Sequence, residues 1–372
     1  MHRSSLIFLP ALLFPFSLLA APDAVKVEVL QNKLEHPWSQ AFLPDNKGLL
    51  VTLKGGQLKH WQAGKGLSDP ITGVPKVWDN GQGGLLDVVL APDFATSRRV
   101  WLSYAEAGAD GKAGTAVGYG RLSDDLSRLE AFQVVFRQMP KLSTGHHFGG
   151  RLVFDGKGYL FIALGENNQR PTAQDLDKLQ GKVVRLTEDG KVPPDNPFVN
   201  TAGARPEIWS YGIRNPQGMA MNPWSDTLWL NEHGPRGGDE INIPEKGKNY
   251  GWPLATHGIN YSGLKIPEAK GEHVEGTEKP LFVWKVSPAV SGMAFYNSDV
   301  FPQWKNKLFI GALKEKDVIV LSVNGNTVTE EGRILGDRKQ RIRDVRVGPD
   351  GYLYVLTDET DGQLLKVSPS GR

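Results

Sequence analysis

The sequence contains no cysteine, which excludes thiol catalysis, cysteine-ligated zinc and iron–sulfur clusters. It also has no excess of charge of one sign, because 43 basic and 41 acidic residues give a net charge of +2 at pH 7. No overall electrostatic field therefore marks the chain for nucleic acid or for an anionic membrane surface. At 372 residues the chain is long enough to bury a core without disulfide bonds.

Long apolar runs are missing beyond the N-terminus. An apolar run over residues 6–19 follows a basic start at His2 and Arg3 and leads into small residues. The run is short and contains two prolines, so it is typical of a secretory signal peptide and not of a membrane-spanning helix. We therefore predict a cleaved signal peptide over residues 1–20, one catalytic domain over residues 21–372, no membrane span and a periplasmic location.

Glycine and proline are abundant, with 43 and 25 copies, and this favours short strands joined by turns over long helices. One pattern, a turn rich in Pro, Asp, Asn or Gly followed by an apolar strand, recurs six times. The copies are PDNKGLLVTL from Pro44, PDFATSRRVWLSY from Pro92, FDGKGYLFIAL from Phe154, NPWSDTLWLNE from Asn222, QWKNKLFIGAL from Gln303 and PDGYLYVLTD from Pro349. The repeat predicts an all-β fold, a six-bladed β-propeller with four-stranded antiparallel blades. A β-sandwich is the alternative, but it gives no reason for one motif to return six times.

Loops at one end of a propeller channel form a natural site, since every blade contributes one. Two long inserts, over residues 166–205 and 232–285, are expected to shape the pocket. Helices should be few, and TAQDLDKLQGKV has room for at most one or two turns.

A cationic pattern stands in RIRDVRVGPDGYLYV, where Arg341 and Arg343 lie two apart and so project from one face of a strand. Two neighbouring positive charges repel each other and destabilise the folded protein unless an anion lies close to them. Lys314 leaves the preceding blade at a comparable point, and GIRNPQGM adds Arg214 and Asn215 on a turn. Arg341, Arg343 and Lys314 at one channel mouth would suit a multiply anionic ligand. The alternative is a solvated strand face.

An oxygen-rich pattern stands in NEHGPRGGDEINIPEKGKNYGWP. Its glycines allow tight turns that expose carbonyl groups, while Asp239 and Glu240 supply carboxylates, and calcium prefers this mixture. His233 and His257 lack a partner at the spacing usual for zinc. An acidic turn that caps a strand remains the alternative.

Two adjacent histidines, His146 and His147, stand in KLSTGHHFGGRLVFDG before a predicted strand. Neighbouring strand residues point to opposite faces, so the two cannot play the same part. The flanking glycines let the backbone approach a ligand closely, and histidine can take a proton near neutral pH. A purely structural histidine is equally compatible with the residues alone.

Taken together, these motifs resemble those of the soluble quinoprotein sugar dehydrogenases, and most of all the bacterial periplasmic aldose sugar dehydrogenases. The resemblance runs from NGQGGLLDVVLAPDF through HHFGGRL, GIRNPQGM, NEHGPRGGDEIN and GKNYGWP to RIRDVRVGPDG. It implies oxidation of aldose sugars at C1 to aldonolactones, with pyrroloquinoline quinone (PQQ) and Ca²⁺ as cofactors and an external electron acceptor. It also implies a monomer or a homodimer.

The resemblance further implies roles for individual residues. His147 matches the general base, and Arg214 matches a cation that stabilises charge on the quinone. His146 stands where the glucose enzymes carry an aspartate, and His233 where they carry a glutamine, which leaves the preferred sugar open. The implied PQQ contacts are Gln82, Arg214, Asn215, Tyr261, Ala312, Lys314, Arg341 and Arg343. The implied calcium ligands are the carbonyl groups of Gly234 and Pro235, with Glu240 and the backbone oxygen of Tyr250 at a second, structural calcium.

Two other functions stay open. A calcium-dependent propeller lactonase or hydrolase could use HGPRGGDE to activate water, but it would have no need of three clustered cations. A non-catalytic sugar-binding propeller would use aromatic walls such as Trp252 and Trp284 without a base.

Overall fold

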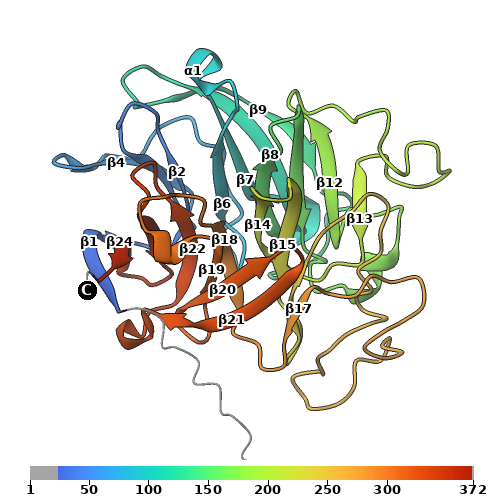
Figure 1. Ribbon diagram of the computed structural model, residues 1–372. Helices are drawn as coiled ribbons and strands as arrows, with labels where there is room; N and C mark the ends of the chain where they lie inside the picture. The colour runs from blue at the N-terminus through green and yellow to red at the C-terminus, as the bar shows by residue number, and fades with distance from the viewer. Residues whose placement is uncertain (1–23, 371–372) are drawn as a thin grey trace, which may run out of the picture.

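The computed structural model describes residues 24–370, so the predicted signal peptide lies outside the described residues. Its regular structure is almost entirely β, in six four-stranded antiparallel sheets arranged around a common centre (Figure 1). The predicted six-bladed propeller is confirmed. Within the described range no helix is long and apolar enough to cross a membrane.

The first three blades follow one another along the chain. The first contains β2 (Pro37–Phe42), β3 (Leu49–Leu53), β4 (Gln57–Gln62) and β5 (Gly66–Leu67). The second contains β6 (Leu85–Leu90), β7 (Arg99–Ala107), β8 (Ala113–Leu122) and β9 (Leu129–Arg137). The third contains β10 (Gly149–Phe154), β11 (Tyr159–Leu164), β12 (Lys182–Thr187) and β13 (Ile208–Tyr211).

The last three blades complete the ring. The fourth contains β14 (Pro216–Asn222), β15 (Thr227–Glu232), β16 (Asp239–Asn242) and β17 (Phe282–Trp284). The fifth contains β18 (Val290–Phe295), β19 (Lys307–Ala312), β20 (Val318–Asn324) and β21 (Thr327–Ile334). The sixth contains β22 (Ile342–Val347), β23 (Leu353–Thr357), β24 (Gly362–Pro369) and β1 (Val25–Leu34).

Helical segments are short, as expected. They are α1 (Phe94–Ser97) and the 3₁₀ turns η1 (Ala109–Gly111), η2 (Arg170–Gln174), η3 (Pro302–Trp304) and η4 (Gly336–Arg338). The segment TAQDLDKLQGKV holds only the end of η2 before β12 begins at Lys182.

Each of the six recurrent motifs forms the second strand of a blade together with the turn before it. The strands are β3, β7, β11, β15, β19 and β23. In the first motif Asp45 and Asn46 have φ angles of 58° and 56°, and the N–H of Leu43 donates to the carbonyl of Gly48. Short polar side chains tolerate this left-handed conformation, which joins two twisted strands. The motif repeats because every blade needs a turn between its first and second strands.

The ring closes through β1, which pairs antiparallel with β24 at the edge of the sixth blade, for example Val27 opposite Val367. In Figure 1 these two strands lie side by side although they come from opposite ends of the described chain. Because the first strand of each blade also contacts the first strands of its neighbours, the six form a continuous inner wall.

Packing between blades uses apolar side chains from neighbouring sheets, such as Trp229 of β15 against Ile310 of β19. The centre is different, because there the side chain of Arg151 is buried among carboxylates. One of its terminal nitrogens lies 3.0 Å from Asp344 and 3.5 Å from Asp87. This ionic contact joins β10, β22 and β6 below the site described next. It gives a buried cation the partners that burial requires.

Candidate functional site

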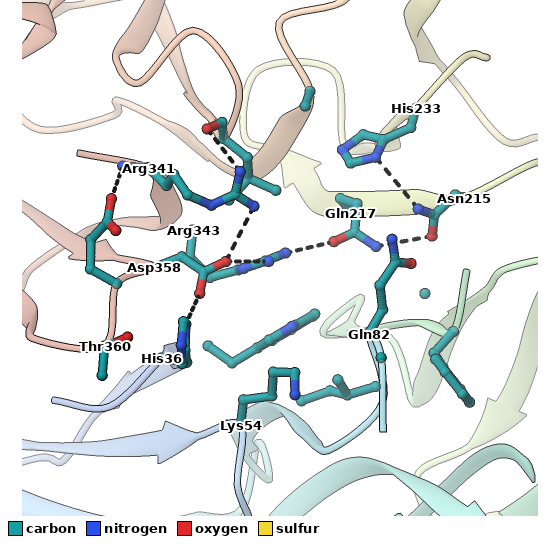
Figure 2. A pocket seen from close by; sticks show the side chains of 18 residues that line it. His36, Lys54, Gln82, Asn215, Gln217, His233, Arg341, Arg343, Asp358 and Thr360 are labelled. Carbon is teal, nitrogen blue, oxygen red and sulfur yellow. Dashed lines mark hydrogen bonds and ion pairs between the residues drawn. The ribbon is translucent and has the colours of Figure 1, made fainter. Parts of the chain in front are cut away.

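An inner cavity of about 580 Å³ lies at one end of the channel, where first strands begin and second strands end. Its wall includes both arginines of the RIR segment and the predicted Gln82 and Asn215 (Figure 2). The lining residues are His36, Trp38, Lys54, Gly81, Gln82, Leu86, Phe148, Gly149, Asn215, Gln217, His233, Ala289, Leu313, Arg341, Arg343, Asp358, Glu359 and Thr360. Loops at one end of the propeller therefore do form a pocket.

Asp358 lies between the two arginines of this cavity. One of its carboxylate oxygens is 2.6 Å from a terminal nitrogen of Arg343 and 3.7 Å from one of Arg341 (Figure 2). The other oxygen is 2.8 Å from Nδ1 of His36. Burial raises the pKa of Asp358, but the nearby charge of Arg343 and the bonds to His36 and Arg343 outweigh it and hold this pKa well below its usual range. The carboxylate thus fixes the orientation of Arg343 while it offsets part of the positive charge.

A row of hydrogen bonds runs from Arg343 across the cavity. The guanidinium of Arg343 donates to Oε1 of Gln217 at 2.9 Å, and Nε2 of Gln217 donates to Oδ1 of Asn215 at 3.0 Å. Nδ2 of Asn215 lies 3.5 Å from Nδ1 of His233, whose Nε2 is 2.6 Å from the carbonyl of Val290 (Figure 2). A carbonyl only accepts, so His233 carries its proton on Nε2. Burial lowers the pKa of His233 to about 4, which keeps the ring neutral.

His147 precedes Phe148 and Gly149 of the cavity wall and is itself buried, whereas His146 is exposed. The two residues sit in a bend before β10, and not on a strand, so their different surroundings come from the bend and from the positive φ of His147, 55°. The backbone N–H of His147 donates to Oε1 of Gln82 at 2.8 Å. Gln82 therefore links His147 to the cavity.

The ring of His147 is oriented by Glu166, a fully buried carboxylate that is hydrogen-bonded to its Nδ1. Burial lowers the pKa of His147; Glu166 opposes this shift, and the nearby charge of Arg214 adds to it. Since the carboxylate accepts the Nδ1 proton, the lone pair is left on Nε2. The arrangement presents a neutral imidazole that is able to take a proton.

An outer cavity of about 870 Å³ adjoins the inner one, and His233 and Ala289 line both. Lys314, Tyr261, Gly234 and Pro235 line the outer cavity. The side chain of Lys314 is 59% exposed and lies 3.4 Å from Glu315. Lys314 does not line the inner cavity with the two arginines, but its neighbour Leu313 does, and Arg341 donates to the carbonyl of Leu313 at 3.3 Å. Lys314 stands one residue beyond Leu313, on the border between the two cavities.

Arg214 is buried and does not line the inner cavity. Its Nη1 donates to the carbonyl groups of His233 at 3.1 Å and Gly234 at 2.7 Å, and its guanidinium lies 5.2 Å from the ring centre of Trp252. The carbonyl of Gly234, which the resemblance assigns to calcium, therefore accepts a hydrogen bond from Arg214. Ala312 is also fully buried, and its N–H donates to the backbone carbonyl of Asp317.

Two carboxylates, the buried Glu232 and the half-buried Glu240, line a small void beside Arg214 and Gly234. Burial raises the pKa of Glu232 to about 7. Burial and the charge of Glu232 raise the pKa of Glu240 well above its usual value. Oδ1 of Asn242, whose amide group donates to both carboxylates, has no partner among residues 24–370. The two carboxylates repel each other, and the amide oxygen of Asn242 lacks a donor, so a bound cation would suit these oxygen atoms.

Tyr250 was predicted to join Glu240 at a second calcium through its backbone oxygen. Its phenol group is bonded to the backbone of Ile243 and Glu245, and the residue does not line the void within the described structure. Between residues 24 and 370, no group of three or more His, Asp or Glu side chains is placed to hold a metal ion.

The two inserts differ in what they do. Residues 232–285 supply the loop that lines the outer cavity, whereas residues 166–205 line neither cavity and brace that loop. Gln174 and Asn249 exchange hydrogen bonds at 3.0 and 2.8 Å, and Arg170 pairs with Glu268 at 3.2 Å.

Sequence reasoning missed Glu166, Asp358 and Gln217. Glu166 and Asp358 share no motif with their partners, since Glu166 is 19 residues from His147. Gln217 lies in GIRNPQGM with Asn215, but its other partner, Arg343, is 126 residues away. One usable signal was position, since Asp358 directly follows the second strand of its blade, as Leu313 and His233 do. Polar residues at that point in each blade were candidates for the same mouth.

Comparison with known proteins gives a consistent result. A family model described as glucose/sorbosone dehydrogenase matches residues 34–366. The chain is 78% identical over 369 residues to aldose sugar dehydrogenase YliI of Escherichia coli (strain K12), covering 99% of this chain and 100% of that protein.

Solved structures agree. The soluble aldose sugar dehydrogenase of Escherichia coli in its apo form superposes with a TM-score of 0.93 at 80% identity, covering 93% of this chain and 100% of the other. The PQQ-bound aldose sugar dehydrogenase of Streptomyces coelicolor superposes with a TM-score of 0.74 at 28% identity, covering 94% of this chain and 100% of the other.

Proposed function

Because the chain belongs to the glucose/sorbosone dehydrogenase family and is an oxidoreductase, we propose that it oxidises aldose sugars at C1 with PQQ bound in the inner cavity. A single arrangement carries this proposal. Arg341 and Arg343 line the cavity. His147, a neutral histidine bonded to the buried Glu166, directly precedes Phe148 and Gly149 of the cavity wall.

The inner cavity fits a flat, multiply anionic cofactor. Arg341 and Arg343 present guanidinium forks that match carboxylates, and Nε of Arg343 is buried without a hydrogen-bond partner in the described chain. Trp38 and Phe148 add aromatic surface to the same wall. Gln82 and Asn215 supply amide groups that can donate or accept. These residues would hold PQQ, with Lys314 and Tyr261 on the outer cavity and the buried backbone of Ala312 as a further contact that the resemblance implies.

PQQ supplies, when bound, a quinone that accepts the hydride from C1 of the sugar. The protein's own part is to hold the sugar and to move a proton. Nε2 of His147 is the atom that takes the proton of the C1 hydroxyl group, since Nδ1 is bonded to Glu166. The backbone bond from His147 to Gln82 keeps this nitrogen fixed relative to the cavity wall. Arg214 brings a fixed positive charge close to His147, where negative charge develops.

Calcium fits the oxygen atoms beside the outer cavity. Gly234 and Pro235 lie in a glycine-rich turn, and the void next to it contains Glu232 and Glu240. A bound Ca²⁺ would relieve the repulsion that raises the pKa of Glu240. The resemblance also assigns Glu240 and the backbone oxygen of Tyr250 to a structural calcium site; the void supports this assignment for Glu240 alone, since Tyr250 does not line it.

We also propose that residues 1–20 direct export to the periplasm and are removed there. The electrons then pass to an external acceptor that meets the protein in that compartment. N-terminal sequencing of the protein from a periplasmic fraction tests the cleavage, which should follow Ala20.

Reconstitution tests the function itself. Purified protein is incubated with Ca²⁺ and PQQ and then given an aldose and an electron-accepting dye. We expect dye reduction that requires both PQQ and sugar, while lactone hydrolysis without dye reduction would favour a hydrolase. His147→Gln should lower kcat by roughly 10²–10⁴-fold and leave PQQ binding nearly unchanged. Ordinary turnover by that variant would remove His147 as the base.

A further inference from the structure

Exposed apolar side chains gather at the mouth of the outer cavity. The described residues include nine large hydrophobic side chains that are strongly exposed. Three of these, Ile259, Tyr261 and Val286, line this cavity, and a fourth, Leu264, is adjacent to Gly263, which also lines it. Tyr261, Leu264 and Val286 are 75%, 70% and 69% exposed. Apolar groups clustered on a surface in this way mark sites of contact with another molecule.

The loop that carries Ile259, Tyr261 and Leu264 is braced by hydrogen bonds. Arg236 and Ile259 exchange backbone hydrogen bonds at 2.8 and 3.1 Å, and the N–H of Asn260 donates to the carbonyl of Leu264 at 2.8 Å. Nη1 of Arg170, from the other insert, also reaches the side chain of Asn260. In Figure 1 the insert over residues 232–285 projects from the sheets beside β17. Such a surface is preorganised, so little conformational entropy is lost on binding.

Cations surround the apolar side chains. Arg236, Lys265 and Lys285 are exposed, and none of them forms an ion pair within residues 24–370. Arg236 and Lys285 line the outer cavity itself. The single carboxylate of that lining is Asp239, which is buried and turned inward to the N–H groups of Gly234 and Val290. The surface is therefore apolar at its centre and positive around it. We call it the rim patch, made of Ile259, Tyr261, Leu264 and Val286 with Arg236, Lys265 and Lys285.

We propose that the rim patch is the docking surface for an acidic electron-transfer protein, a proposal that rests on the function proposed above. The outer cavity shares His233 and Ala289 with the inner one, so a protein docked here lies against the opening of the cofactor site. An aldose is neutral, so it gives no reason for the free cations, whereas a protein with carboxylates around an apolar contact face matches both the cations and the apolar centre.

The electron balance agrees with such a partner. Oxidation of an aldose to its lactone breaks the C1–H and O1–H bonds and releases two electrons and two protons. Two molecules of a haem protein would each take one electron, reducing Fe(III) to Fe(II), and the two protons enter solvent. Each acceptor must leave before the next arrives, and a small interface in which electrostatic attraction speeds association suits this exchange.

The test uses the reconstituted enzyme with cytochrome c in two forms, the basic native protein and the same protein made acidic by succinylation of its lysines. A neutral dye and ferricyanide serve as small acceptors. We expect reduction of the succinylated form at least tenfold faster than that of the native form at low salt, and a loss of this difference at high salt.

Variants then locate the surface. The double substitution Lys265→Glu and Lys285→Glu should slow reduction of succinylated cytochrome at least tenfold and leave the rate with neutral dye within about twofold. Leu264→Ser with Val286→Ser should slow the same reaction without changing its dependence on salt. The matched control is Lys47→Glu with Lys65→Glu, two exposed lysines of the first blade, which should change neither rate.

Three results would overturn the proposal. Equal rates with both forms of cytochrome would show that charge does not select the partner. An equal slowing of ferricyanide and cytochrome by the lysine variants would show that the patch only concentrates small anions. Unchanged cytochrome reduction in both double variants would place docking elsewhere. Absence of dye reduction by the wild-type enzyme is a different outcome, because it removes the proposed function and this inference with it.

Discussion

The carboxylate of Glu166 holds Nδ1 of His147, and this contact decides which nitrogen of the ring is free. Glu166 is completely buried, and its other carboxylate oxygen has no hydrogen-bond partner in the described part of the chain. The same loop returns a second bond, because the N–H of Asn167 donates to the carbonyl of His147 at 3.2 Å. His147, the proposed base, is therefore positioned through both its ring and its backbone.

Replacing Glu166 by glutamine should lower kcat by roughly 10²–10⁴-fold, because the amide no longer favours the tautomer with its proton on Nδ1. Steady-state kinetics with saturating PQQ measure this. The affinity for PQQ, followed by quenching of tryptophan fluorescence, should stay close to that of the wild type. A large loss of PQQ affinity with unchanged kcat would mean that Glu166 supports the cavity and not the base.

The pH dependence of kcat/KM should show an acidic limb. His147 acts as a base only when neutral, and burial lowers its pKa below the ordinary value of 6.5. Activity should therefore be full at neutral pH and should fall as the pH drops below about 6.5.

The same profile provides an internal check. Glu166 raises the pKa of His147 against the effect of burial, so Glu166→Gln should move the acidic limb to lower pH. Because a protonated His147 loses its stabilising partner in this variant, a shift to higher pH would contradict the assignment.

Arg343→Lys should weaken PQQ binding by about 10–100-fold, because an ammonium group cannot reproduce the two-pronged contact of a guanidinium with a carboxylate. The fluorescence titration measures the dissociation constant. Arg128→Lys is the matched control, since Arg128 is exposed and pairs only with Glu130 among the described residues. Equal affinities in all three proteins would show that Arg343 does not contact the cofactor.

Gly165→Ala should destabilise the protein, because a Cβ atom at this position would lie 1.9 Å from the carbonyl oxygen of His147. Displacing that backbone costs roughly 1–3 kcal/mol, measurable by urea denaturation, and should reduce kcat as well. Gly145→Ala is the control from the same region, since a Cβ atom there meets nothing within 4 Å. A Gly165→Ala protein with wild-type stability and turnover would show that the loop tolerates movement.

The blades could be predicted from the sequence because each depends on a local signal. A turn with a positive φ, as at Asp45 and Asn46, and the apolar strand after it occupy about ten consecutive residues, and the signal recurs in all six blades. The closure of the ring by β1 and β24 could not be predicted in this way. Val27 and Val367 are 340 residues apart, and nothing in either strand specifies the other.

The site residues likewise fall into those that a local motif predicts and those whose position depends on the packing of the blades. Arg341, Arg343, Gln82 and Asn215 were predicted from motifs, and the structure brings all four to the inner cavity. Lys314 was predicted from its position after a strand, but its side chain lines the neighbouring cavity, while Leu313 lines the inner one. Such a lateral shift depends on how blades pack, which a linear pattern does not contain.

Partners that satisfy buried charges were also beyond the sequence. Asp358 sets the charge and orientation of Arg343, and Glu166 sets the tautomer of His147. In both pairs the interaction exists only because two separate loops meet at the channel end. The sequence around a carboxylate does not indicate which of the many cationic or histidine side chains of the protein will be its partner.

A crystal structure of the protein with PQQ and Ca²⁺ tests the account most directly. It should show PQQ carboxylates about 2.7–2.9 Å from the guanidinium groups of Arg341 and Arg343, and Nε2 of His147 facing the quinone across the inner cavity. PQQ bound away from both arginines, or with His147 turned from it, would contradict the account.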